Sequence, residues 1–183
     1  GWPAEYRGPR GALPAASLAY QRRPGQLDAS GGVKGTFRAG GETGLPGGEP
    51  GEPVFSESDL LTLLVREKKM TLTGHVRAWQ KENVLRCATL TLDDPAKTLR
   101  AQGEVKAFLR RKPQATTAKG GSAASETVNA SGELLTYRER ERTVRIEGQS
   151  SVQSGPWVTN ADILDLKLGA DRSIEYAESR GTR

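Results

Sequence analysis

The stretch Leu61-Thr-Leu63-Leu-Val-Arg-Glu-Lys-Lys-Met70-Thr-Leu72-Thr-Gly74-His-Val76 decides the fold of this chain. Apolar residues take every second position on both sides of a charged middle segment, and threonines stand between them. Alternation with a period of two predicts β-strands with one apolar face. The six residues between Leu63 and Met70 are rich in charge and indicate a turn. The stretch therefore predicts a β-hairpin with one buried and one solvated face.

This unit recurs, and it can be written as Leu, any residue, Leu or Tyr, six residues, an apolar residue, three residues and Gly. In the fifth copy we assign the later apolar position to Ile174, one residue late, and the glycine position to Glu178. Five hairpins predict about ten strands in an all-β protein. The other four copies begin at Leu18, Leu90, Leu135 and Leu164, and a small residue stands three positions before each leading Leu: Ala15, Ser58, Cys87, Gly132 and Ala161.

Composition narrows the function classes. The 183 residues carry a net charge of +5, but the basic residues are scattered, so charge alone selects no partner. One cysteine and one histidine are too few for a Cys/His metal site, and the glycine-rich nucleotide-binding motifs are missing. We predict no enzyme activity, no cofactor and no metal. No apolar stretch is long enough to cross a bilayer and no signal peptide begins at Gly1, which indicates a soluble, mature or trimmed form.

Two segments interrupt the repeats. Residues 39–53 and 111–127 are rich in Gly, Pro, Ser or Ala, which is typical of flexible insertions. Hairpins on both sides of each insertion belong to one array, so we predict a single domain over residues 15–180. Residues 1–14 show no repeat and are expected to form an N-terminal extension.

The repeats resemble a known family, the OstA-like domain of lipopolysaccharide-transport proteins, which includes LptA, LptC and the N-terminal part of LptD. The resemblance rests on Leu72-Thr-Gly74-His-Val76, on Leu99-Arg-Ala-Gln-Gly103-Glu-Val105 and on Val144-Arg-Ile-Glu-Gly148, and it covers Ala15 to Glu178. It implies a twisted, open β-jellyroll of stacked antiparallel hairpins. It also implies a bridge in the periplasm of a Gram-negative bacterium that passes lipopolysaccharide, or a related acylated lipid, between inner- and outer-membrane components. The member of the family is left open.

The apolar columns of the repeat are candidates for contact with acyl chains, because hairpins with one apolar face bury those faces against one another. Plain core packing explains the same residues, and both interpretations stay open. The lipid-groove candidates are Leu61, Leu63, Leu72, Val76, Leu90, Leu92, Leu99, Val105, Leu135, Tyr137, Val144, Ile146, Leu164, Leu166 and Ile174. Contacts to lipid phosphates, or simply solubility, would account for Arg77, Arg86, Lys106, Arg110 and Arg111.

An open array of hairpins has edge strands, which can accept another protein by strand addition. We expect head-to-tail homo-oligomers and pairing with related transport proteins. The alternative is a scaffold protein that polymerises through its edges and binds no lipid. Nucleic acid is not expected, since basic residues alternate with Glu and aromatic residues are only 5% of the chain. We place Trp79 and Trp157 in short connections, where they cover the end of the sandwich or contact lipid.

Overall fold

The computed structural model describes residues 4–8, 11–38, 44–49, 51–111, 126–170 and 174–181. Within these ranges the regular structure consists of strands, and no helix occurs. The strands are β1 (Ala4–Gly8), β2 (Gly11–Ala15), β3 (Ser17–Gln21), β4 (Gln26–Arg38), β5 (Pro53–Leu64), β6 (Lys69–Gln80), β7 (Asn83–Asp93), β8 (Thr98–Arg111), β9 (Glu126–Arg138), β10 (Thr143–Ser154), β11 (Trp157–Leu168) and β12 (Ile174–Arg180).

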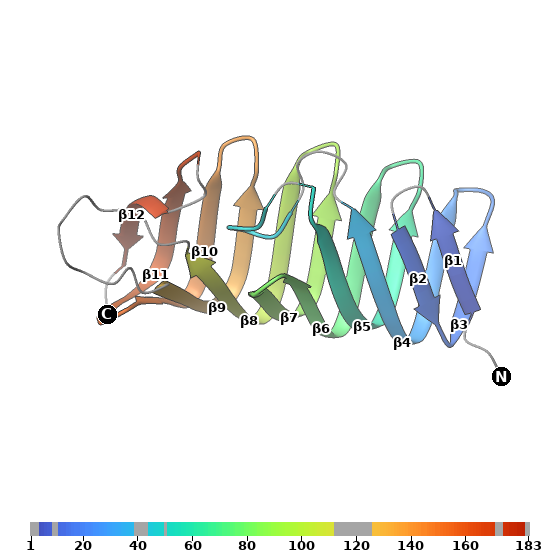
Figure 1. Ribbon diagram of the computed structural model, residues 1–183, viewed down its shortest axis with the longest axis horizontal. Helices are drawn as coiled ribbons and strands as arrows, with labels where there is room; N and C mark the ends of the chain where they lie inside the picture. Colours follow the sequence, from blue (N-terminus) through green and yellow to red (C-terminus); the bar gives the residue numbers. More distant parts are fainter. Residues whose placement is uncertain are drawn as a thin grey trace.

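All of these strands belong to one antiparallel sheet. From β4 to β12 each strand pairs with the next one along the chain, while β3 pairs with the first half of β4 and β2 with its end. The five predicted hairpins are β3–β4, β5–β6, β7–β8, β9–β10 and β11–β12, with β1–β2 as a further pair. The all-β, open jellyroll prediction is confirmed, and Figure 1 shows the hairpins stacked along the long axis.

Each long strand bends sharply near its middle. The bend of β6 lies at Gly74 and His75, where two residues face the single residue Ala88 of β7. Both bend residues have positive φ, 80° and 46°, and an extra residue in this conformation forms a β-bulge that turns the strand. Bulges at Gly31, Gly103 and Gly148 repeat the turn in β4, β8 and β10. We call these positions corners.

The corners divide the sheet into two layers, visible in Figure 1. The tip arm comprises the strand halves that end at the hairpin tips: residues 17–21, 26–30, 60–64, 69–73, 89–93, 98–102, 134–138, 143–147, 163–168 and 174–180. The rim arm comprises β1, β2 and the other strand halves: 33–38, 53–58, 76–80, 83–87, 105–111, 126–132, 150–154 and 157–161.

The corner also explains the small residue three positions before each leading Leu. In β7 the buried residues have odd numbers in the rim arm, as Leu85 and Cys87, and even numbers in the tip arm, as Leu90. The alternation shifts by one where Ala88 faces the bulge of β8. A small residue and the Leu three positions later therefore both point to the interior, although a regular strand would place them on opposite faces.

Our assignment of the fifth repeat was wrong. Leu166 pairs with Ala177, as Leu63 pairs with Met70, so Ala177 and not Ile174 takes the later apolar position. The glycine position belongs to Gly181, whose φ is +67°, and its carbonyl accepts a hydrogen bond from the Asp162 amide at 2.9 Å. β11 runs on to Leu168 before the chain turns, and this added length displaces the repeat.

The structure places strand residues of the expected N-terminal extension over 1–14 in the sheet itself, in β1 and most of β2, where Leu13 joins the core. The first insertion is described for 44–49 and 51–53, and its Leu45 is buried. Residues 39–43 and 50, and the second insertion over 112–125, lie outside the described residues. The domain boundaries stay a prediction.

Candidate functional site

The groove candidates gather in the interior between the two arms. Twelve of the fifteen are buried, and Leu63, Leu92 and Ile174 are partly buried and pack against the same cluster. The cluster is continuous from Leu13 on β2 to Leu168 on β11. The interior is therefore one apolar strip along the stack of hairpins. The twelve buried candidates are Leu61, Leu72, Val76, Leu90, Leu99, Val105, Leu135, Tyr137, Val144, Ile146, Leu164 and Leu166.

The two arms line this interior differently. The tip arm contributes mostly large side chains, as shown by Leu99 at 0% exposure beside Leu90 and Leu135 at 1%. The rim arm contributes many small side chains. The sequence analysis did not separate the two arms, because the columns of both arms belong to one repeat unit. The buried small residues of the rim arm include Ala15, Ser56, Ser58, Ala78, Cys87, Ala107, Ala130, Ser150 and Ala161.

A segment of the first insertion lies beside the end of β6, at an edge of the interior that we call the mouth. Residues 44–49, which we call the strap, pass near the connection between β6 and β7 (Figure 1), and Leu45 of the strap belongs to the buried core. The amide of Gln80 donates hydrogen bonds to the carbonyls of Glu49 and Glu52, at 2.7 and 3.0 Å. Lys81 forms ion pairs with the carboxylates of both glutamates, at 2.5 and 3.2 Å.

Sequence reasoning missed the strap. A leucine in a Gly- and Pro-rich segment was the available signal, because that composition otherwise predicts a solvated loop. The strap holds its apolar side chain at the mouth through contacts made chiefly by the end of β6.

Three of the predicted phosphate contacts lie outside this interior. Arg77, Arg86 and Lys106 are exposed on the outer face of the rim arm, and they are register neighbours on β6, β7 and β8. The side chains of Arg110 and Arg111 lie outside the described part of the structure. The structure thus brings three of the five basic residues together, in a row one strand apart from each other.

Beside this basic row runs a row of apolar residues, of which the sequence analysis singled out only Trp79. Phe55, Trp79, Val84 and Phe108 are register partners across β5 to β8. Trp79 lies inside β6 and not in a connection, while Trp157 is the first residue of β11 and is 77% exposed. The signal was available, because these residues occupy the positions between buried ones.

Cys87 lies in the interior of the rim arm with 7% exposure. Burial raises the pKa of its thiol to about 11, against weaker lowering by backbone hydrogen bonds from Gln102 and Thr89. A thiol with such a pKa is protonated and unreactive near neutral pH. Cys87 is therefore a packing residue in the small-residue column of the repeat.

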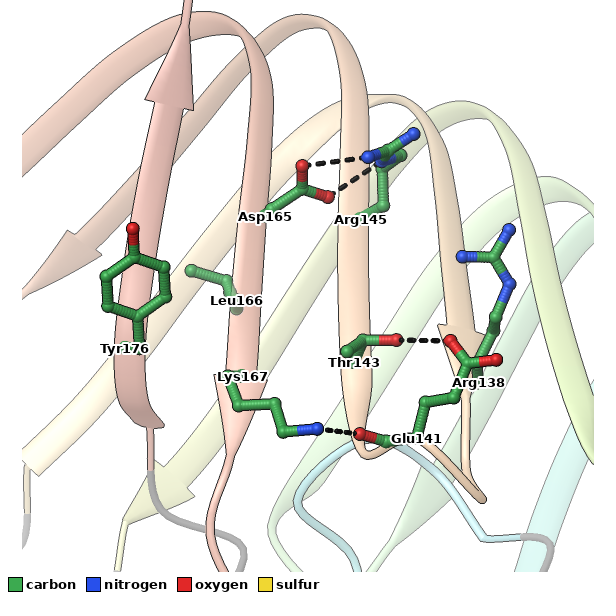
Figure 2. Close-up of a pocket in the computed structure, with 8 residues that line it drawn as sticks. All are labelled: Arg138, Glu141, Thr143, Arg145, Asp165, Leu166, Lys167 and Tyr176. Atoms are coloured by element: carbon green, nitrogen blue, oxygen red, sulfur yellow. Dashed lines mark hydrogen bonds and ion pairs between the residues drawn. The ribbon is translucent and has the colours of Figure 1, made fainter.

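A cavity of about 320 Å³ opens on the outer face near the hairpin tips of β9–β12 (Figure 2). Arg145 donates hydrogen bonds to both carboxylate oxygens of Asp165, at 2.7 and 2.9 Å, and Lys167 donates to the Glu141 carbonyl. The Arg145 hydrogen bonds lower the pKa of Asp165, against its partial desolvation. Two of the three cations around this cavity are thus already paired, and its remaining lining residues are Arg138, Thr143, Leu166 and Tyr176.

Two further searches concern only the described residues. None of their segments forms a helix that is long and apolar enough to cross a membrane. They also hold no group of three or more His, Cys, Asp or Glu side chains arranged to bind a metal ion.

Comparisons with known proteins agree with this geometry. No curated protein sequence matches the chain. Among solved structures, the chain is similar to LptH from Pseudomonas aeruginosa, described as the LptA homologous periplasmic component of the conserved lipopolysaccharide transport device. The TM-score is 0.55 at 16% identity, over 72% of this chain and 84% of LptH, which shows a shared fold. The model of the family described as LptA/(LptD N-terminal domain) LPS transport protein matches residues 57–171, and the chain therefore belongs to this family of lipopolysaccharide-transport proteins.

Proposed function

We propose that this protein is a periplasmic bridge component that holds the acyl chains of lipopolysaccharide between its two arms. The observation that carries the proposal is the continuous apolar interior from β2 to β11. Burial of an acyl chain gains about 0.8 kcal/mol for each methylene group. No covalent chemistry is needed, which accords with a family of transport proteins.

Entry of lipid requires the mouth to open. We infer that acyl chains take the place of Leu45 and that the strap moves aside when they enter. The small side chains of the rim arm leave thickness for a chain, while the large side chains of the tip arm supply the contact area. We place this function in a single domain over residues 15–180, with insertions around 39–53 and 111–127, and Leu13 of β2 extends its interior.

The edge strands of the sheet support the proposal that the protein assembles into a bridge. In the described part of the chain, β12 pairs only with β11, and β3 pairs only with β4. Strand edges of this kind accept another strand through main-chain hydrogen bonds. A second copy, or a related transport protein, adds at either end and continues the apolar interior. Because β3 and β12 differ, the contact is head to tail and does not close into a ring.

Photo-crosslinking of lipopolysaccharide tests this function. A photoreactive residue at Leu92, which points to the interior, should crosslink to the lipid, while the same residue at Arg100, exposed on the outer face, should not. Leu45→Ser should raise the rate of crosslinking at Leu92 because it weakens the closure of the mouth. Absence of crosslinks at Leu92 in both proteins, with concentration-dependent chains still forming, would instead establish the scaffold function.

A further inference from the structure

We infer that the outer face of the rim arm over β5–β8 is a docking surface for an anionic membrane. The surface consists of an apolar row, Phe55, Trp79, Val84 and Phe108, and a basic row, Lys34, Arg77, Arg86 and Lys106. We call it the docking face. It is distinct from the interior proposed to hold acyl chains, and the inference does not depend on that proposal.

The apolar row is continuous in the sheet. Phe55 pairs with Trp79, Trp79 with Val84, and Val84 with Phe108, on four neighbouring strands. These residues alternate with buried ones such as Ala78 and Ala107, so they point outward. Phe55 and Phe108 are 36% and 40% exposed. Adjacent large apolar residues on a solvated sheet face mark an interaction surface, whereas single ones do not.

The row has definite ends. On one side Phe55 pairs with Thr36 of β4, and on the other Phe108 pairs with Asn129 of β9. The apolar patch is therefore limited to four strands. If apolar residues were simply frequent on this whole face, the row would not be bordered by a polar residue on each side.

The basic row runs parallel, two residues closer to the corners. In register it reads Lys34, Glu57, Arg77, Arg86 and Lys106 across β4–β8, which is four cations and one anion. Two residues along a strand span about 7 Å, so each cation lies next to the apolar row. A basic row beside an apolar row fits a lipid bilayer that has negative headgroups at its surface and apolar acyl chains beneath them.

One cation and two aromatic rings are arranged together. The rings of Phe55 and Trp79 stack with centroids 5.7 Å apart, and the guanidinium carbon of Arg77 lies 4.9 Å from the Trp79 centroid. Trp79 is thus held on the sheet with a cation beside its ring. Tryptophan and arginine in this combination suit the boundary between headgroups and acyl chains. A protein partner with an acidic patch offers charge alone, whereas an anionic bilayer matches both rows.

The test is sedimentation with vesicles made of equal parts phosphatidylcholine and phosphatidylglycerol. The wild-type protein should bind these vesicles and not vesicles of phosphatidylcholine alone. Each basic residue near an anionic surface contributes about fivefold in affinity, so R86Q/K106Q should bind roughly 25-fold more weakly. F55S/F108S should bind roughly tenfold more weakly, since it removes exposed apolar area. Circular dichroism and thermal unfolding verify that each variant is folded.

Matched controls lie on the outer face of the tip arm. R100Q removes an exposed cation from β8, and L60S removes a leucine of β5 that is 51% exposed. Both should bind within about twofold of wild type, as should the interior variant L92S. Equal loss in R100Q, or equal loss in L92S, would overturn the inference, because binding would then come from overall charge or from lipid uptake in the interior.

A second measurement reads the docking face directly. The variant W2F/W157F leaves Trp79 as the single tryptophan of the chain, which has three. Brominated phospholipid in the anionic vesicles should quench its fluorescence. Failure of the wild-type protein to bind anionic vesicles, or binding without quenching of Trp79, would overturn the inference. So would a dimer that F55S/F108S dissociates while vesicle binding is absent, since the face would then belong to a second copy of the chain.

Discussion

The two arms of this sheet come from the same strands yet differ in what they place in the interior. Among its buried residues the tip arm has many leucines, such as Leu90, Leu99 and Leu135, whereas the rim arm adds small residues such as Cys87, Ala107 and Ala130. On the outer face the difference is reversed, because the rim arm carries the aromatic row of the docking face and the tip arm carries mainly threonines and charged residues. The comparison teaches that the tip arm supplies most of the stabilising packing. The rim arm has small side chains on its inner face and large apolar side chains on its outer face.

The largest effect is expected from removing bulk in the tip arm. Leu99→Ala should lower the free energy of unfolding by about 3 kcal/mol, because a fully buried leucine leaves a cavity between β7 and β9. Urea unfolding measures this, with Arg100→Ala on the outer face as the neutral control. Val105→Ala in the rim arm should cost roughly 1–2 kcal/mol, since fewer methyl groups are removed. Equal losses for Leu99 and Val105 would contradict the proposed difference between the arms.

Alkaline pH should weaken the rim arm through Cys87. The pKa of this thiol is raised to about 11 in the folded protein, while the unfolded thiol loses its proton near pH 9. Between these values the folded state binds more protons, so its stability falls as pH rises, by about 2–3 kcal/mol in total.

The measurement is the free energy of unfolding of wild type and of Cys87→Ala from pH 8 to pH 11. Subtracting the two curves removes every pH-dependent contribution that the two proteins share. The difference should stay constant below about pH 9 and then decline, and a flat difference up to pH 11 would show that Cys87 is solvated.

The corner between the arms should tolerate no side chain at Gly103. Its φ is +78°, and an added Cβ would lie 2.8 Å from the Cβ of Ala88. Gly103→Ala should cost about 2 kcal/mol through strain and crowding together. Gly32→Ala separates the two causes, because Gly32 has a φ of +66° and nothing within 4 Å of an added Cβ. Thermal unfolding should show a smaller loss for Gly32→Ala, and Ala88→Gly should recover part of the loss in Gly103→Ala.

The smallest effect concerns the outer face of the tip arm. A double-mutant cycle with Arg145→Met and Asp165→Asn should give a coupling of about 0.2–1 kcal/mol, since both side chains are partly exposed. The pKa of Asp165 is lowered, so this contribution is present above the usual aspartate pKa and is lost as pH falls through the lowered value. Persistence of the full coupling at a pH where Asp165 is protonated would contradict this account of the pair.

Much of the fold could be predicted because its determinants are local. Strands alternate with a period of two, and the turn predicted between Leu63 and Met70 coincides with the end of β5 at Leu64 and the start of β6 at Lys69. The predicted register of the fifth repeat was wrong, because the point at which β11 ends and the chain returns sets the register of β12. The spacing of apolar residues does not set it. Leu166 pairs with Ala177, whereas Ile174 pairs with Leu168. A rule based on residue spacing cannot anticipate that the preceding strand is longer.

The sequence by itself determined which residues turn inward, since the pattern of apolar columns requires a shared buried face. Only the tertiary structure decided what meets there. The corners bring the buried residues of both arms into one core, and the fold adds Leu45, from a segment without periodicity in which the Glu49 carbonyl accepts a hydrogen bond from Gln80. Register also aligned Phe55, Trp79, Val84 and Phe108 into one row. These arrangements depend on pairing between distant parts of the chain, which local alternation does not specify.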